Sequence, residues 1–134
     1  MATKHIKVLI IDDDPFLSGV YAVGLKNDGM LVQAINDPQE GLNALAKELP
    51  DVVLLDLMMP GMNGFEVLQR IRSNKAMANL PVIVLSSLAQ PEDIKRSLEA
   101  GASAFLQKTQ TLPLEASNKI RALLKIPREP KKRV

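Results

Sequence analysis

The stretch Pro50-Asp-Val-Val-Leu-Leu-Asp56-Leu-Met-Met-Pro60-Gly-Met-Asn-Gly64 decides the fold. Its apolar residues 52–55 are too few and too β-branched for a helix, so they predict a buried strand. Asp56 ends this strand, and a proline and two glycines mark a chain reversal behind it. A carboxylate in this position lies at the carboxyl edge of a sheet, where open α/β folds bind their ligands. The alternative is that Asp56 merely caps the following turn or helix.

A second apolar run ends in three consecutive acids, Asp12, Asp13 and Asp14. Asp14 has a local role as the N-cap of a helix that begins at Pro15, because proline loses no hydrogen bond at the first helical position. Asp12 and Asp13 have no such role. Beside Asp56 they predict an oxygen-only site for a hard cation, with Mg²⁺ as the expected ion. The alternative is a solvated acidic turn.

Two further predicted strands are also followed by polar side chains. Residues 82–85 precede Ser86, and the shorter strand 104–106 leads to Lys108. Taken singly, a strand-end serine is usually hydrogen-bonded locally and a strand-end lysine is usually solvated. However, a parallel sheet brings the carboxyl ends of its strands to one edge. The acids, the hydroxyl and the amine are therefore expected to lie together.

Strand and helix patterns alternate five times along the chain, which predicts an α/β fold with a doubly wound parallel sheet and helices on both faces. The candidate strands are residues 7–11, 31–35, 52–56, 82–85 and 104–106. Caps mark the helix starts at Asp37-Pro38-Gln39-Glu40, at Asn63, before Pro91 and at Thr111. The side chains expected to face the core from the second and third helices are Leu42, Leu45, Ala46, Leu49, Phe65, Leu68 and Ile71.

Composition limits the function classes. A chain of 134 residues, 46% of them hydrophobic, predicts one domain with one core, assigned to residues 4–126. The absence of cysteine excludes disulfides, thiol catalysis and zinc fingers. The only histidine, His5, precedes the first strand, which argues against a Ser-His-Asp hydrolase. The apolar run before Asp12 is too short for a signal peptide or a membrane span, so a cytoplasmic protein without a membrane partner is expected.

The net charge of +2 arises in the last residues of the chain. Residues 126–134 hold four of the 17 basic and one of the 15 acidic residues, so the remainder carries a net charge of −1. The segment 127–134 is therefore predicted to be a basic, disordered tail or the stub of a linker. It is too short for a DNA-binding effector domain, and no direct contact of this domain with nucleic acid is expected.

The four strand ends together resemble the receiver domain of two-component response regulators, over about residues 7–124. The matching motifs are Leu9-Ile-Ile-Asp-Asp-Asp14, Asp56-Leu-Met-Met-Pro-Gly-Met-Asn-Gly64, Pro81-Val-Ile-Val-Leu-Ser86 and Gly101-Ala-Ser-Ala-Phe-Leu-Gln-Lys108. Four motifs in this order are far more specific than any one of them. The resemblance implies a flavodoxin-like sheet of order 2-1-3-4-5, with the acids at the switch point between strands one and three.

The resemblance implies that Asp56 accepts a phosphoryl group from the phosphohistidine of a sensor histidine kinase or a histidine phosphotransfer protein. A carboxylate is ionised near neutral pH and needs no separate base. Its difficulty is repulsion from the incoming anion, which Mg²⁺ on Asp13 and Asp56, with Asp12 reached through water, would remove. By resemblance, the backbone carbonyl of Met58 is a further ligand of the metal.

The remaining residues complete the implied mechanism. Lys108 would place a positive charge against one phosphoryl oxygen, and Ser86 would donate a hydrogen bond to another. By resemblance, Ser86 and then Phe105 move inward, and the face of helix four, strand five and helix five signals to an output protein or a fused effector. A homodimer that forms through this face on phosphorylation is left open. From the sequence alone, Phe105 is equally well explained as a plain core residue.

Two departures from the family leave alternatives open. Thr109 follows Lys108 where proline is common, and Phe105 replaces the commoner tyrosine. A phosphorylation-independent interaction module is therefore one alternative to the phosphoacceptor. Another is a haloacid-dehalogenase-like phosphatase, because the acidic run contains Asp-x-Asp, although Phe16 does not fit that motif. The acidic loop would repel the phosphate of a bound flavin mononucleotide. The phosphoacceptor reading predicts a regulatory protein rather than an enzyme.

Overall fold

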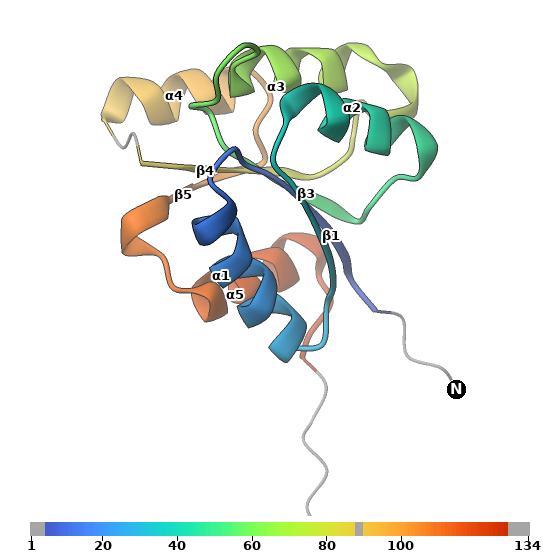
Figure 1. Cartoon of the computed structure of the whole chain (residues 1–134), viewed down its shortest axis with the longest axis vertical. Coiled ribbons are helices and arrows are strands. Elements are labelled where there is room, and N and C mark those ends of the chain that lie inside the picture. The colour runs from blue at the N-terminus through green and yellow to red at the C-terminus, as the bar shows by residue number, and fades with distance from the viewer. Residues whose placement is uncertain (1–4, 88–89, 129–134) are drawn as a thin grey trace, which may run out of the picture.

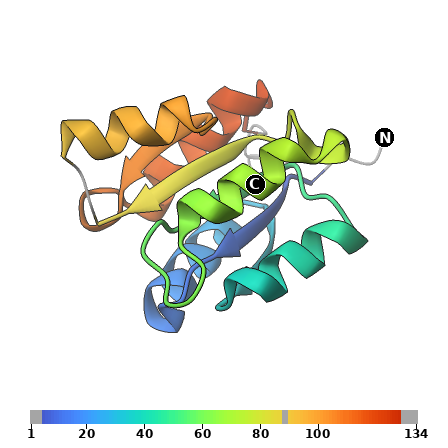
Figure 2. The same ribbon diagram turned by 90° about the horizontal axis from the view of Figure 1, so that it is seen from above.

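The computed structural model describes residues 5–87 and 90–128, which form one α/β unit with a single parallel sheet. The strands are β1 (Lys7–Ile11), β2 (Leu31–Ile35), β3 (Val52–Leu55), β4 (Val82–Ser86) and β5 (Ala104–Gln107). The helices are α1 (Pro15–Asn27), α2 (Pro38–Lys47), α3 (Gly64–Ser73), α4 (Pro91–Glu99) and α5 (Pro113–Leu124), with 3₁₀ turns at Lys75–Met77 and Lys108–Gln110. Helices α1 and α5 cover one face of the sheet and α2, α3 and α4 the other (Figures 1 and 2).

The strand order is β2-β1-β3-β4-β5, which confirms the predicted doubly wound sheet. The five predicted strands are all present, and their ends differ by one residue at most. Asp56 lies just beyond β3 rather than within it, while β4 includes Ser86 and β5 includes Gln107. Because the strands are parallel, the polar residues at the ends of β1, β3, β4 and β5 lie at the same edge of the sheet.

The central strands separate two apolar cores. Val8 and Ile10 of β1 pack with residues of α1 and α5, whereas Leu9 and Ile11 pack with residues of α2 and α3. Because successive side chains of a strand point to opposite faces, a strand covered on both sides needs apolar residues at every position. This explains why the sequence shows unbroken apolar runs in place of an alternating pattern.

Strand register places the acidic loops side by side. Ile11, the last residue of β1, is aligned with Leu55, the last residue of β3. The backbone N–H of Asp56 donates to the carbonyl of Ile11 at 2.9 Å, and that of Asp12 donates to the carbonyl of Ile35 at 3.1 Å. The two carboxylates therefore leave neighbouring strands at the same level.

Three of the predicted helix caps are confirmed in detail, and the Asn63 side chain accepts from the N–H of Glu66 at the start of α3. The Asp14 side chain accepts from the N–H groups of Phe16 and Leu17, and the Asp37 side chain accepts from that of Glu40. The caps Asp14 and Asp37 are each followed by a proline at the first helical position, as predicted. The predicted cap at Thr111 is wrong.

Helix α5 begins one residue later than predicted, because the N–H at its cap position is bonded to a side chain of the helix's own first turn. The cap position is Leu112, whose N–H donates to the side chain of Glu115 at 3.1 Å. The carbonyl of Thr111 instead accepts from the hydroxyl of Tyr21. A threonine shortly before a proline was therefore a misleading signal here.

The predicted core face of α2 is partly wrong. Leu42 and Leu45 are buried, but Ala46 is exposed and Leu49 is 43% exposed. The helix ends at Lys47, so Leu49 lies beyond it and is not held to the helical period. Gly41 lies on the buried face of α2 instead. It allows the helix to pack closely on β1, because a Cβ there would lie 2.7 Å from a methyl carbon of Ile11.

In α3, Leu68 and Ile71 are buried as predicted, but Phe65 is only partly buried. The guanidinium of Arg96 in α4 lies 3.9 Å from the centre of the Phe65 ring. Val67 is fully buried at the position expected for an inward side chain. The ring thus serves a contact between two helices, which the helical period does not reveal.

The predicted tail falls largely outside the described residues, which end at residue 128. Arg128, near its start, forms two hydrogen bonds of 2.8 Å with the carboxylate of Asp28. Arg121 and Ser117 of α5 also donate to this carboxylate. Hydrogen bonds from these partners hold the pKa of Asp28 well below its usual range. Within residues 5–87 and 90–128, no helix is long and apolar enough to cross a membrane.

Gly24 permits the close contact between α1 and α5. A Cβ at this position would overlap the side chain of Pro113, whereas one at Gly19 would meet nothing within 4 Å. Gly24→Ala should therefore lower the free energy of unfolding by about 1–3 kcal/mol through overpacking. Gly19→Ala should raise it by up to about 1 kcal/mol, because alanine favours a helix. Urea denaturation followed by circular dichroism compares the two, and equal effects would contradict the prediction.

Candidate functional site

The polar side chains predicted from the strand ends meet at the carboxyl edge of the sheet. Asp12, Asp56, Ser86 and Lys108 lie at the ends of β1, β3, β4 and β5. Their exposed fractions are 1%, 3%, 0% and 9%. Charged residues are rarely buried to this extent unless they are paired. Their burial together therefore indicates a preorganised polar site rather than a group of solvated surface side chains.

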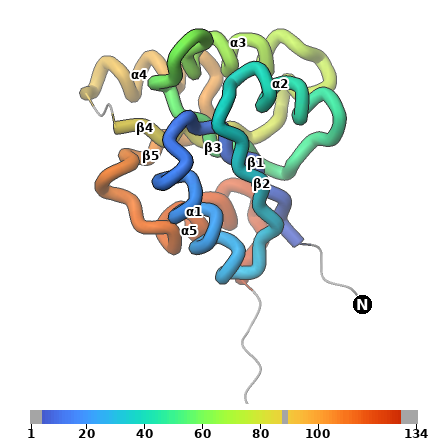
Figure 3. Tube along the Cα trace, in the orientation of Figure 1, coloured from blue at the N-terminus to red at the C-terminus, as the bar shows by residue number. Residues whose placement is uncertain are grey.

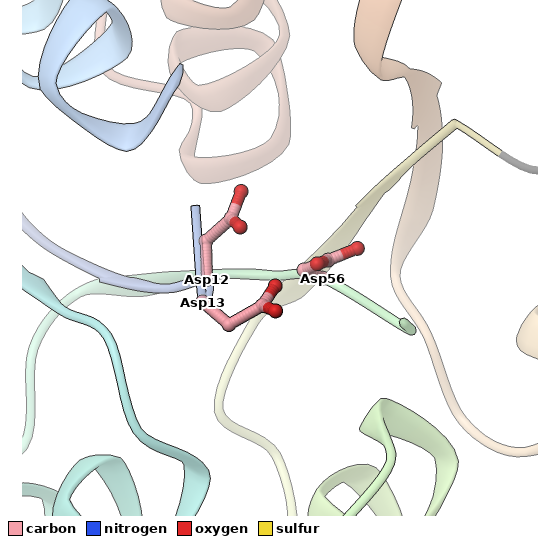
Figure 4. A group of neighbouring side chains, drawn as sticks. All are labelled: Asp12, Asp13 and Asp56. Atoms are coloured by element: carbon pink, nitrogen blue, oxygen red, sulfur yellow. The ribbon is translucent and has the colours of Figure 1, made fainter. Parts of the chain in front are cut away.

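The three predicted acids form one cluster. Asp12, Asp13 and Asp56 each offer a carboxylate oxygen, and these atoms lie within 4.8 Å of one another. Figure 4 shows Asp12 and Asp13 in succession after β1, with the carboxylate of Asp13 directed towards Asp56. Asp13 is partly exposed while the other two are buried, so solvent has access to the cluster from the side of Asp13.

Lys108 is the cation of this cluster. Its Nζ lies 2.7 Å from Oδ2 of Asp12 and 3.4 Å from Oδ2 of Asp56. One ammonium group offsets only one of the three carboxylates, and burying the remaining negative charge is unfavourable. An all-oxygen donor set with an excess of negative charge fits a hard divalent cation, so the residues present are suited to hold one.

The electrostatics of Asp56 follow from its surroundings. Burial, assisted by the carboxylate of Asp12, raises the pKa of Asp56 to about 6. The N–H of Met58, 3.2 Å from Oδ1 of Asp56, and the ammonium of Lys108 act in the opposite direction. Burial alone would lower the pKa of Lys108, but its pairing with Asp12 and Asp56 outweighs this and raises it.

Several supporting residues were not predicted from the sequence. The Asn36 side chain donates to the carbonyl of Asp12 at 2.8 Å and lies 3.2 Å from the hydroxyl of Ser18. Asn36 directly follows β2, so it could have been identified, like the other site residues, as a polar residue at the end of a predicted strand. The hydroxyl of Tyr21 lies 2.9 Å from the carbonyl of Lys108 and fixes the lysine loop. Tyr21 occurs in an apolar helix and resembles a core residue, so no sequence pattern pointed to this role.

Gly64 allows the loop after β3 to close tightly. Its N–H donates to the carbonyl of Leu57 at 3.0 Å. A Cβ on Gly64 would overlap the carbonyl oxygen of Asp56 and the Cα of Leu57. Because these are backbone atoms that cannot rotate away, only glycine permits the start of α3 to approach Asp56 so closely.

Three further predictions concern residues around the cluster. Met58 follows Asp56 by two positions, with its side chain 56% exposed, and the role of its carbonyl as a metal ligand stays a prediction. Phe105 is partly buried on β5, aligned with Val84, and its switching role also stays a prediction. All peptide bonds between described residues are trans, including that from Lys108 to Thr109. The ammonium nevertheless reaches both carboxylates.

Residues 8–116 match the family model of the response regulator receiver domain. The chain belongs to this family. Among curated relatives, it is 39% identical to the DNA-binding dual master transcriptional regulator RpaA of Synechocystis, over 89% of this chain and 49% of that protein. It is 34% identical to the DNA-binding response regulator MtrA of Mycolicibacterium smegmatis, over 93% of this chain and 53% of that protein. The receiver domain thus spans about half the length of these relatives.

Solved structures support the same assignment. The chemotaxis response regulator CheY4 of Vibrio cholerae matches with a TM-score of 0.83 and 26% identity, over 90% of this chain and 99% of that chain. The BeF₃-activated N-terminal receiver domain of RstA from Klebsiella pneumoniae matches with a TM-score of 0.81 and 30% identity, over 89% and 98%. Receiver domains are regulatory signal-transduction domains and act as phosphoacceptors in two-component systems. Membership of this family does not favour the phosphatase or the phosphorylation-independent alternative.

The raised pKa of Asp56 predicts that, without a metal, the free energy of unfolding depends on pH through this carboxyl group. The pKa is near 3.9 in an unfolded chain and about 6 in the fold. Protonated Asp56 therefore favours folding below pH 4, and this contribution is lost as the pH rises through 6. Asp56→Asn should raise the free energy of unfolding at pH 8 by about 1–3 kcal/mol, with little change at pH 4.

Urea denaturation in the presence of a chelator, at both pH values, checks this. Asp37→Asn is a matched control, because Asp37 is an exposed cap that asparagine can replace. An equal gain from Asp56→Asn at pH 4 and pH 8 would contradict the assigned electrostatic origin.

Proposed function

We propose that Asp56 is the phosphoacceptor of this receiver domain and takes its phosphoryl group from a phosphohistidine on a partner protein. The observation that carries this proposal is the position of Asp56, buried with two other acids and 3.4 Å from the ammonium of Lys108. A sensor histidine kinase or a histidine phosphotransfer protein would supply the phosphohistidine. The receiver domain is then the substrate of a regulatory transfer and not an enzyme with turnover of its own.

In the transfer, a carboxylate oxygen of Asp56 forms a bond to phosphorus as the bond from phosphorus to the histidine nitrogen breaks. Asp56 has a pKa of about 6, so it is ionised and nucleophilic near pH 7.5. Phosphoryl transfer depends mainly on positioning and on neutralising charge. Lys108 lies close enough to Asp56 to meet the charge on a phosphoryl oxygen, and its exposed fraction of 9% limits screening by water.

The cation we propose for this site is Mg²⁺, held by the carboxylates of Asp13 and Asp56 and the carbonyl of Met58, with Asp12 reached through water. The supporting observation is the all-oxygen cluster with its excess of negative charge. When bound, Mg²⁺ would neutralise the phosphoryl oxygens as they approach the carboxylate. Asp13 is the partly exposed member, so it offers the route by which a hydrated ion enters.

We further propose that Ser86 hydrogen-bonds the phosphoryl group, and that Phe105 then transmits the change to the face of α4, β5 and α5. The packing of α4 supports this choice of face. Of its residues, Ser97 is the one that is buried, and the cap residue Gln90 makes no side-chain hydrogen bond to the helix. An element with so few buried contacts moves at a low energetic cost.

The output partner would be a separate protein or a fused effector. The curated relatives RpaA and MtrA are named as DNA-binding proteins and are about twice as long as the matched region. We propose that residues 4–126 form the receiver and that residues 127–134 are a basic linker. A homodimer through the α4, β5 and α5 face on phosphorylation is part of this proposal, as is a cytoplasmic location, where kinases find their ATP.

The phosphoacceptor assignment is tested by intact mass after incubation with Mg²⁺ and acetyl phosphate or phosphoramidate. The wild type should gain one phosphoryl mass that hydroxylamine removes, because an acyl phosphate reacts with that nucleophile. Asp56→Asn should gain none. Asp37→Asn, which changes an exposed cap, should be phosphorylated like the wild type. A stable adduct on Asp56→Asn would refute the assignment.

Lys108→Ala should separate metal binding from phosphoryl transfer. The ammonium repels a cation, so its loss should leave Mg²⁺ affinity unchanged or tighter, as measured by calorimetry. Phosphorylation should slow by about 10²-fold or more, the usual effect of removing one preorganised charge donor. Lys95→Ala, which removes an exposed lysine of α4, is the control. A loss of Mg²⁺ affinity in Lys108→Ala would contradict this division of roles.

A further inference from the structure

Strand β2 leaves one margin of the sheet open. It lies outside β1, at the opposite margin from β5 (Figure 3). Strands β3 and β4 are buried at every residue, whereas no residue of Leu31–Ile35 is buried. Leu31 is 51% exposed on the face that α2 covers, and Ala34 is exposed on the face that α1 covers. Neither helix therefore closes over this edge.

The open edge presents backbone groups suited to pairing with a further strand. The N–H of Leu31 and the carbonyl of Ile35 form hydrogen bonds of 2.9 and 3.1 Å with residues that flank β1. Because the backbone groups of successive strand residues point to opposite edges, those of Val32 and Ala34 point away from β1. Proteins usually protect such an edge with a charge, a proline or a bulge. Residues 31–35 contain no charge and no proline, and their register with β1 is continuous.

A groove of about 630 Å³ lies beside β2 on the α2 face of the sheet. Helix α2 connects β2 to β3, and β1 lies between these two strands, so α2 leaves the side chains of β2 partly uncovered. The β2 side chains on this face are Leu31, Gln33 and Ile35, and all three line the groove. Its floor is therefore apolar at both ends of the strand and carries an amide at the centre.

The wall of the groove adds one charge near each end. Glu40 and Lys47 of α2 line the groove and are exposed. Helix α2 joins two parallel strands and so runs antiparallel to them, which places Glu40 level with the end of β2 and Lys47 level with its start. Lys7 and Glu48 also line the groove, but they pair with each other at 2.7 Å. The groove thus has a negative and a positive end.

We propose that β2 pairs antiparallel with β2 of a second copy of this chain, about a two-fold axis between the two Gln33 residues. In this register, Val32 of each copy lies opposite Ala34 of the other. Each such pair exchanges two backbone hydrogen bonds, and the symmetry makes the pair occur twice. The two sheets of five strands then join into one continuous sheet.

The side chains obey the same symmetry. Leu31 lies opposite Ile35 of the second copy, so apolar side chains meet on the α2 face. The two Gln33 amides meet at the axis, where each can both donate and accept a hydrogen bond. The two copies of α2 run in opposite directions, so Glu40 of one copy lies opposite Lys47 of the other. One axis satisfies backbone, apolar and charged groups together, which identifies a second copy as the occupant.

The test is sedimentation equilibrium of the whole chain without a phosphodonor. The wild type should dimerise, and Leu31→Lys should raise the dissociation constant by more than about tenfold, because a charge then opposes an apolar side chain. Leu98→Lys is the matched control, since Leu98 is 48% exposed in α4. The dimer leaves the α4, β5 and α5 face free, so Asp56→Asn should dimerise like the wild type.

Ala34→Pro examines the backbone pairing. It removes an N–H from the open edge and leaves the hydrogen bonds to β1 intact, a position at which edge strands tolerate proline. The variant should keep the circular dichroism spectrum of the wild type, and its dissociation constant should rise by more than about tenfold. A folded Ala34→Pro variant that dimerises like the wild type would refute strand pairing.

Charge exchange examines the register without altering β2. Glu40→Lys and Lys47→Glu should each raise the dissociation constant by about three- to tenfold, because both opposite-charge pairs become like-charge pairs. An equimolar mixture of the two variants should recover the dimer, since the ammonium introduced at position 40 then faces the carboxylate introduced at position 47. The double variant should recover it for the same reason. Lys95→Glu, in α4, is the control.

Three outcomes would overturn the proposal. A wild type that stays monomeric up to about 1 mM would leave the edge of β2 to a strand of a different protein. A dimer that Leu98→Lys weakens as much as Leu31→Lys would have its contact elsewhere. Charge variants that neither the mixture nor the double variant rescues would contradict the antiparallel register.

Discussion

The ion pairs of Lys108 with Asp12 and Asp56 are the interaction on which the arrangement of the site depends. Two carboxylates that are 1% and 3% exposed can stay in the fold only if a cation is beside them. That cation comes from the end of β5, two strands away from β3, so the parallel order of the sheet is a condition of the pairing. The carbonyl of Lys108, held by Tyr21, fixes the loop that carries it.

The pairing is incomplete, and this connects structure to function. One ammonium group between three carboxylates leaves a negative site that attracts a cation. Burial, assisted by the carboxylate of Asp12, keeps the pKa of Asp56 near 6. Burying this charge lowers the stability of the fold. Two apolar cores, one on each face of the central strands, offset that loss, and the residues of these strands are almost all buried. The scaffold thus holds a strained cluster of charge without rearranging to relieve it.

The sequence was sufficient for the sheet and for the residues at its edge, because strand ends in a parallel sheet converge whatever the helices do. The sequence was insufficient where the position of a side chain depends on its contact with an element distant in the chain. Phe65 follows the helical period yet contacts Arg96 of another helix, and Leu49 lies just beyond the end of α2. Tyr21 could not be recognised, since the partners of its hydroxyl, Lys108 and Thr111, are 87 and 90 residues further along the chain.

The surroundings of Asp56 are rigid, whereas helix α4 is held more weakly. Asp56 lies between β3 and a helix start that only a glycine admits, so its backbone has little freedom. In helix α4, Ser97 is the buried residue, and Arg96 lies over the ring of Phe65 in α3, a contact worth about 0.5–1 kcal/mol at an exposed site. If Asp56 is phosphorylated as proposed, the change of charge would displace α4 more readily than it would distort the sheet, because displacement follows the weakest contacts.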